Sequence, residues 1–352
     1  MHRLHLLATS AVCLYTLCSC QPEGLARETS SRTPARITLK PEQSPVLRKT
    51  FRRELESEGK LSDRGGELSE LAGGEVDAVA TTSSTARSVL VVVDRVQSAD
   101  GGRVSKLERT YEKIGGDRHE EVVFEVMKPK PLVERESEEA SCALEGQAVT
   151  FDWDGGGGTY GVSGDLDDDL LTHLRFDLDL VGFLPDGEVA AGDEWELEAE
   201  AFQGVVDFMD GLPLEWAADP VVLEGWEPDE ELEVHERIDG EITLTYAGTR
   251  MVDGAGLAMV EFEGELETER TEDYGGTADD ESTFHSEEDE TCQVEGVLLW
   301  DLEHGHAYSL VIEMELETKA SETLTGSRDF HSQTRGTTGT VTLRADFERV
   351  ED

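Results

Sequence analysis

Basic residues are scarce in this sequence, and their scarcity excludes one large class of function. The 352 residues include only 30 lysines and arginines against 79 aspartates and glutamates, which gives a formal net charge of -49. Such a negative field repels the phosphates of nucleic acids and the headgroups of anionic lipids. We therefore expect no nucleic-acid partner, and any contact with a membrane must depend on something other than surface charge.

Recognisable catalytic signatures are also absent. The sequence has no Gly-x-Ser-x-Gly elbow, no His-Glu-x-x-His motif, no phosphate-binding glycine loop and no CxxC pair. The acidic run from Asp165 to Asp169 begins like a calcium loop, but Leu170 and Phe176 stand where that loop needs Gly and Glu. No complete motif supports a Ca²⁺ cofactor, and the sequence predicts a protein that is not an enzyme.

The N-terminus carries the strongest single signal. The apolar run from Leu4 to Leu17 is too short to span a bilayer, and it leads into Leu17-Cys18-Ser19-Cys20. This ending resembles the lipobox of bacterial lipoproteins, in which the final cysteine is acylated and becomes the mature N-terminus. The resemblance implies that residues 1–19 are a signal peptide and that Cys20 joins the protein to a membrane. By the sorting pattern of that family, Gln21 favours the outer membrane; an ordinary cleaved signal peptide is the alternative.

Two cysteines, Cys142 and Cys292, remain beyond the export segment. In an oxidising compartment, two cysteines predict one disulfide. The long loop that it would close corresponds to about 4–5 kcal/mol of stabilisation in the chain-entropy model. Two buried thiols are the alternative.

The remaining chain divides by composition into a tether and a domain. Residues 20–35 are polar and predict a flexible tether behind the acylated cysteine. Residues 36–352 have patterned apolar positions and predict a single β-rich extracytoplasmic domain. Within it, residues 59–85 are rich in Gly, Ser, Thr and Glu and predict a long disordered loop at the surface.

Alternation of apolar and polar residues dominates this domain and is typical of strands with one buried face. Glutamates fill many of the polar positions, so the other face is expected to be acidic and wet. Residues 165–174 and 202–209 instead have apolar residues at helical spacing. We expect an α+β fold dominated by β: a large, curved, half-barrel-like antiparallel sheet with two short mid-chain helices. Predicted strands lie at 37–58, 89–93, 104–111, 122–127, 176–180, 194–199, 242–246, 260–267, 310–317 and 341–347.

A second resemblance lies in the middle of the chain. Leu184-Pro185, the nearby Gly192-Asp193-x-Trp195 and a later Leu299-Trp300-Asp301-Leu302 resemble a pattern in uncharacterised bacterial lipoproteins and secreted β-rich proteins. That family implies no activity. Pro185 and Gly192 are typical of turns, and Trp195 is expected to open a strand as a core anchor, so we interpret Pro185, Gly192, Asp193 and Trp195 as structural.

His304 and His306 form the closest histidine pair in the sequence. Two histidines one residue apart on a strand share a face and could begin a metal site. Gly305 between them favours the tip of a hairpin instead, and Asp301 or Glu303 are the only further ligands nearby in sequence. A pair of turn histidines is the favoured interpretation, and a metal site is the alternative.

These patterns predict a lipid-anchored protein of the bacterial cell envelope with a structural or protein-interaction role. The partner would then be the membrane, through the lipid, together with another envelope protein. An alternative is a carrier that holds a hydrophobic small molecule on a concave apolar sheet. A second alternative is an extracytoplasmic hydrolase that uses carboxylates or a metal at the two histidines.

Overall fold

The computed structural model describes residues 34–43, 46–64, 78–100, 103–124, 132–153, 160–171, 174–176, 178–206, 208, 212, 214–216, 233–252, 254–274, 283–325 and 330–350. The predicted signal peptide, with Cys20, lies outside these residues, as does most of the predicted tether. The domain begins slightly earlier than expected, because β1 (Ala35–Arg36) already pairs with β8 (Glu188–Val189).

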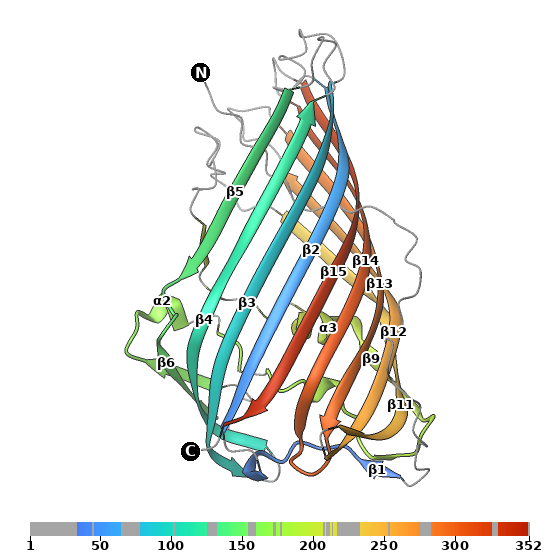
Figure 1. Ribbon diagram of the computed structural model, residues 1–352. Helices are drawn as coiled ribbons and strands as arrows, with labels where there is room; N and C mark the ends of the chain where they lie inside the picture. Colours follow the sequence, from blue (N-terminus) through green and yellow to red (C-terminus); the bar gives the residue numbers. More distant parts are fainter. Residues whose placement is uncertain are drawn as a thin grey trace.

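One large antiparallel sheet dominates the described chain, as the alternation predicts (Figure 1). Eight of its strands have 19 to 23 residues, which corresponds to about 65–80 Å of extended chain. These long strands are β2 (Val46–Arg64), β3 (Ala78–Asp100), β4 (Arg103–Phe124), β11 (Glu233–Val252), β12 (Ala255–Tyr274), β13 (Thr283–Asp301), β14 (His306–Thr325) and β15 (Phe330–Arg349). The shorter strands are β5 (Leu132–Cys142), β6 (Ala148–Trp153), β7 (Tyr160–Gly164), β9 (Glu194–Glu198) and β10 (Leu214–Trp216).

The strands form two meanders that one long-range pairing joins into a single open sheet. It runs β10-β5-β4-β3-β2-β15-β14-β13-β12-β11-β9, and β6 and β7 extend it beside β4. β2 pairs with β15, so the first and last long strands lie side by side in the centre of the sheet. This pairing joins the two halves of the chain into one sheet.

The sheet curves around a segment of its own chain. Figure 1 shows α3 (Ala199–Val206) inside the curve. Phe202 of α3 lies edge-on to Phe262 of β12 with ring centroids 6.3 Å apart, and Phe208 stacks on Phe51 of β2 at 5.2 Å. Since β2 and β12 are four places apart along the sheet, only strong curvature brings both to the same short segment.

The apolar core occupies one end of the sheet, which we call the packed end (46–55, 89–114, 242–262, 294–314 and 341–349). Most of its inward positions are large and apolar, for example Leu244, Trp300 and Leu343, each with an exposed fraction of 0%. At the other end of the same strands many inward positions are small or polar. Buried polar residues there are Ser57, Glu120, Thr318 and Thr337, and they lie among a few buried apolar residues such as Leu61 and Val122. The concave apolar face is therefore most extensive at the packed end.

Gly296 of β13 allows especially close packing in this core because glycine has no side chain. A Cβ atom built there would lie 2.3 Å from a ring carbon of Phe262 and 2.5 Å from the carbonyl oxygen of Val311. The glycine therefore allows the Phe262 ring to lie directly on the backbone of β13. Gly336 of β15 is the opposite case, because nothing lies within 4 Å of a Cβ built there.

The outward face of the sheet is acidic, as the alternation predicts. Glu295 of β13 stands directly opposite Glu263 of β12 on one side and Glu313 of β14 on the other, and all three are exposed. Like charges at directly opposed positions repel one another. A face of this kind is incompatible with burial in hydrocarbon, where each charge is costly.

Two local predictions are wrong in part. Residues 59–64 and 78–85, expected in a loop, belong to β2 and β3, which pair with each other here and bury Leu61 and Ala80; 65–77 lie outside the described residues. The strand expected at 176–180 is not found at the described positions of this range, 176 and 178–180. The carbonyl groups of Arg175 and Phe176 accept hydrogen bonds from the Arg109 side chain rather than from a neighbouring strand.

Both mid-chain helices exist, but they are minor elements. α2 (Asp168–Leu171) has only 4 residues and packs against β7, whereas α3 has 8 residues and packs against β9 and β11. Short 3-10 turns occur at η1 (Pro41–Gln43) and η2 (Val181–Phe183). In the described part of the chain, every helix is too short or too polar to cross a membrane.

Candidate functional site

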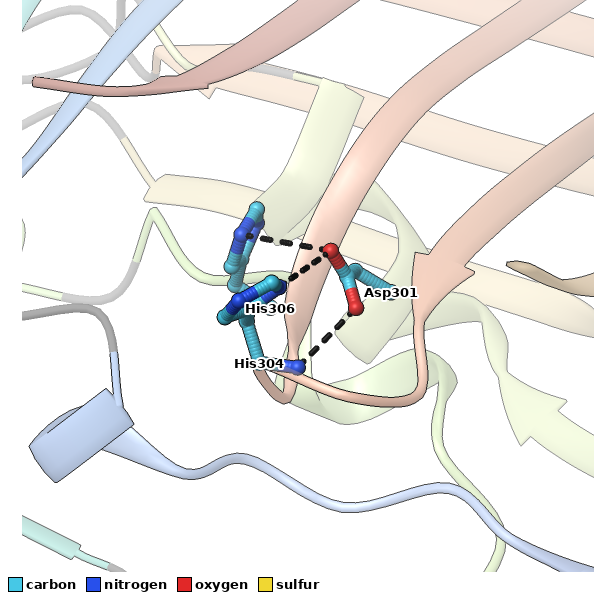
Figure 2. Close-up of side chains that lie close together, drawn as sticks. All are labelled: Asp301, His304 and His306. Carbon is cyan, nitrogen blue, oxygen red and sulfur yellow. Dashed lines mark hydrogen bonds and ion pairs between the residues drawn. The ribbon is translucent and has the colours of Figure 1, made fainter. Parts of the chain in front are cut away.

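The hairpin between β13 and β14 gathers three potential metal ligands at the packed end. Asp301 ends β13, His306 begins β14, and His304 lies in the turn between them. One ligand atom from each residue lies within 4.8 Å of the other two. The structure therefore brings together both histidines of the predicted pair and one of the two acids suggested by the sequence (Figure 2).

The carboxylate of Asp301 is the centre of this cluster. Its Oδ1 accepts hydrogen bonds from the backbone N–H groups of Glu303 and His304, each at 2.9 Å. Its Oδ2 lies 2.8 Å from Nδ1 of His304 and 4.0 Å from Nε2 of His306. One oxygen therefore organises the turn, and the other faces both imidazole rings.

The two histidines differ in their surroundings. The His306 side chain is 5% exposed, and its Nδ1 lies 2.5 Å from the carbonyl oxygen of Ala307. Burial lowers the pKa of His306, so the ring is neutral at pH 7. The His304 side chain is 24% exposed and lies at the solvent side of the cluster. Burial opposes the charge of Asp301, but hydrogen bonds from His304 outweigh it and lower the pKa of the carboxyl group.

An N-terminal residue holds the turn from outside. Lys40 donates from its backbone N–H to the carbonyl oxygen of Gly305 at 2.9 Å, and its Nζ donates to the carbonyl oxygen of Leu302 at 2.7 Å. Gly305 has a φ of +64°, and a Cβ there would lie 2.5 Å from the Lys40 side chain. The glycine is therefore required both for the turn and for the approach of this residue.

A second polar cluster lies inside the packed end, and the sequence analysis did not identify it. Asp94 of β3 forms a two-pronged ion pair with Arg109 of β4, at 2.6 and 2.7 Å. Lys49 of β2 lies 2.7 Å from Asp94 and 2.6 Å from Asp179. Lys49, Asp94 and Arg109 are at most 3% exposed, so this is a buried four-charge group with no net charge.

This buried group fastens to the sheet the stretch of chain that lies inside its curve, which we call the inserted segment (174–176, 178–193, 199–206 and 208). Arg109 also donates to the carbonyl oxygens of Arg175 and Phe176, at 2.6 and 2.9 Å. Burial works against the charges of Lys49, Asp94 and Arg109, but the opposite charges outweigh it. Arg109 and Lys49 lower the pKa of Asp94 to about 2, and Asp179 and Asp94 raise that of Lys49. Asp94 follows the apolar run 89–93, and a charge at the end of such a run is the sequence signal that could have found it.

The residues of the Leu-Pro and Gly-Asp-x-Trp pattern lie together at the entrance to β9. Gly192 has a φ of +96°, and its N–H donates to the carbonyl oxygen of Tyr246 at 2.8 Å. The Asp193 carboxylate accepts from the backbone N–H of Ala190 at 2.7 Å, and the half-buried Trp195 donates from Nε1 to the carbonyl oxygen of Phe183. Pro185 follows η2 and is half-buried. These contacts form a tight turn into the strand.

The expected disulfide is not formed. Cys142 ends β5 and Cys292 lies in β13, and both are buried thiols in the structure. Five strands separate β5 from β13 along the sheet, so similar flanking sequences do not bring the two sulfurs together. Burial raises the pKa of the Cys292 thiol to about 12, which makes it unreactive.

Comparisons with known proteins assign no family. No protein-family model matches the sequence, and no curated protein does. Among solved structures, the outer membrane protease OmpT from Escherichia coli matches with a TM-score of 0.17 and 8% identity, covering 86% of this chain and 96% of its own. OccK7 (OpdD) from Pseudomonas aeruginosa matches with a TM-score of 0.20 and 6% identity, covering 86% and 98%. OpdK with vanillate, also from Pseudomonas aeruginosa, matches with a TM-score of 0.15 and 9% identity, covering 85% and 99%. Superpositions this poor carry no inference about this chain.

Proposed function

We propose that this chain is a lipid-anchored protein of the bacterial cell envelope, acylated at Cys20, with a non-enzymatic structural or protein-interaction role. The observation that carries the proposal is that the concave apolar surface is filled by the chain itself. Phe183, Phe202 and Phe208 of the inserted segment are 0 to 3% exposed and occupy the inside of the curve. A carrier would need this surface for its ligand.

The energy of that packing favours the interaction role over the carrier. Burial of one phenylalanine side chain is worth about 1.5–3 kcal/mol, so moving these three to admit a ligand would cost about 5–9 kcal/mol. Hydrogen bonds from the buried Arg109 side chain to the carbonyl oxygens of Arg175 and Phe176 hold the same segment in place. At the other end of the strands, polar inward residues such as Ser57 and Thr337 interrupt the apolar surface that a lipid would need, although Leu61 and Val122 are apolar.

The charge of the surface supports a particular mode of attachment. The outward glutamates of β12, β13 and β14 repel anionic headgroups, so the sheet does not itself bind the membrane. Acyl chains at Cys20 would supply the anchor, because each buried methylene contributes about 0.8 kcal/mol. The acidic face remains in water, where it suits a partner with a basic surface.

The test is membrane fractionation and mass spectrometry of the full chain expressed in a bacterial host. Wild type should carry acyl groups on Cys20 and sediment with membranes, and Cys20→Ala should lose both properties. Cys18→Ala is the matched control, because it removes a neighbouring thiol and keeps the acylated position. A Cys20→Ala chain that stays on membranes would overturn the anchor, and lipid retained in native but not denaturing spectra would favour the carrier.

A further inference from the structure

We propose that Asp301, His304 and His306 bind one divalent transition-metal ion of the zinc type. The proposal goes beyond the envelope role above and does not depend on it. It rests on the geometry of the β13–β14 turn, where three donor atoms converge on one point (Figure 2).

The hydrogen bond of His306 leaves the correct nitrogen for a metal. The Nδ1 atom can bond the carbonyl oxygen of Ala307 only as an N–H donor, and the neutral ring then carries its lone pair on Nε2. This is the arrangement in which ligating histidines are held by their second nitrogen. Nε2 is buried and has no hydrogen-bond partner among the residues that the structure describes.

An unpartnered lone pair at this place requires an explanation. Nε2 of His306 faces Oδ2 of Asp301 at 4.0 Å, so two electron-rich atoms are opposed in a buried site. A buried acceptor without a partner costs about 1–3 kcal/mol. A cation between the two atoms would be attracted by both and would remove that cost.

The distances fit a metal after small movements. Ligand atoms about 2.1 Å from a tetrahedral zinc ion lie about 3.4 Å from one another. The carboxylate oxygen is now 2.8 Å from Nδ1 of His304 and 4.0 Å from Nε2 of His306. Each of these two distances therefore changes by well under 1 Å, and the two imidazole nitrogens lie within 4.8 Å of each other. The partly exposed His304 ring can make most of this adjustment, and its Nδ1 proton would leave as the metal binds.

The turn is already organised for this task. Oδ1 of Asp301 is occupied by two backbone N–H groups, which fixes the carboxylate and leaves Oδ2 toward the rings. The backbone N–H of Gly305 donates to the Asp301 carbonyl oxygen at 2.8 Å, and Lys40 holds the outer side of the turn. A ligand set that is fixed before binding loses little entropy when the ion arrives.

The donor atoms select the class of ion. Two imidazole nitrogens and one carboxylate suit Zn²⁺ and its neighbours Co²⁺ and Ni²⁺, whereas Ca²⁺ and Mg²⁺ prefer sites made only of oxygen. Three protein ligands leave a fourth position for water. The 24% exposure of His304 provides the route by which ion and water reach the site.

The experiment is a Co²⁺ titration of the full chain after chelation, followed by optical spectroscopy. An excess of Mg²⁺ occupies the acidic surface, which would otherwise bind cations without selectivity. The expected result is one equivalent of Co²⁺ with the intense visible bands of tetrahedral nitrogen–oxygen coordination, displaced by Zn²⁺. A Co²⁺ ion that Mg²⁺ displaces, or that shows only weak octahedral bands, would overturn the proposal.

Variants assign the ligands. His304→Gln should weaken binding about 100-fold or more, because loss of even an outer partner of a metal ligand costs about 10–100-fold. This residue is partly exposed, so the fold should survive, and His306→Gln supplies a second test at the buried nitrogen. His119→Gln is the matched control, since His119 is an exposed histidine of β4 that bonds Ser137 and lies outside the cluster. Equal affinities in the His304→Gln and His119→Gln variants would refute the assignment.

Discussion

The buried pair of Asp94 and Arg109 makes the sharpest prediction about stability. Together with Lys49 and Asp179 it forms a group of two positive and two negative charges. Asp94→Leu would leave an excess positive charge in the core, and Arg109→Met would leave an excess negative one. Loss of one member of a buried ion pair costs about 3–5 kcal/mol, and we expect each single variant to lose that much free energy of unfolding.

The double variant should behave differently. Asp94→Leu with Arg109→Met removes one charge of each sign and leaves Lys49 paired with Asp179 at 2.6 Å. The core is neutral again, so the double variant should lose about 2–3 kcal/mol less than the sum of the two single variants. Part of the loss remains, because the carbonyl oxygens that Arg109 now bonds would have no donor.

Urea denaturation of the four proteins in one buffer measures this cycle. Arg52→Met is the surface control: Arg52 pairs with Asp346 at 2.9 Å, but both side chains are more than half exposed, so the change should cost about 1 kcal/mol or less. Additive losses in the double variant, or single losses as small as that of the control, would refute the view that charge balance in the core holds the inserted segment.

Four further predictions concern pH, packing, surface charge and thiols. The pKa of Asp94 is about 2 instead of 3.8, so its stabilisation is full above about pH 4 and is lost as the pH falls through about 2. The difference in unfolding free energy between wild type and Asp94→Asn should shrink by about 2 kcal/mol over that range. Gly296→Ala should lower the free energy of unfolding by about 1–3 kcal/mol, because the new methyl group overpacks the core. Gly336→Ala, which has open space around it, should be nearly neutral in the same urea denaturation experiment. Glu295→Gln should raise the melting temperature at low ionic strength by relieving two opposed carboxylates, and the gain should fade in concentrated salt. A colorimetric thiol assay of the acylated chain should find two thiols after unfolding without reductant and almost none before; zero after unfolding would restore the disulfide.

Much of the sheet could be predicted from residue alternation alone. The regular placement of Val260 and Phe262 against Glu261 and Glu263 predicts a strand with one wet face, and β12 is such a strand. The same reasoning failed at 176–180, where apolar residues also alternate. Alternation reports which side chains are buried, and it does not report whether the backbone bonds a neighbouring strand or an arginine side chain.

The sequence predicted only part of the proposed metal cluster. The pattern His304-Gly305-His306 indicated either a turn or a metal site, and Asp301 was one of several acids nearby. Only the closed hairpin showed that the Asp301 carboxylate faces both rings and that Nε2 of His306 is buried without a partner. Orientation of this kind depends on the turn and on the distant Lys40, which short-range spacing does not encode.

The sequence by itself determined that the domain is a β-rich sheet with an acidic outer face, because side-chain period and charge are local properties. The tertiary structure alone decided what fills the concave side, since Phe51 and Phe262 meet the inserted segment from strands far apart in the chain. It also decided that Cys142 and Cys292 do not pair, because strand order sets their separation. Contacts between distant strands depend on register and curvature, and these follow from the whole sheet rather than from any one segment.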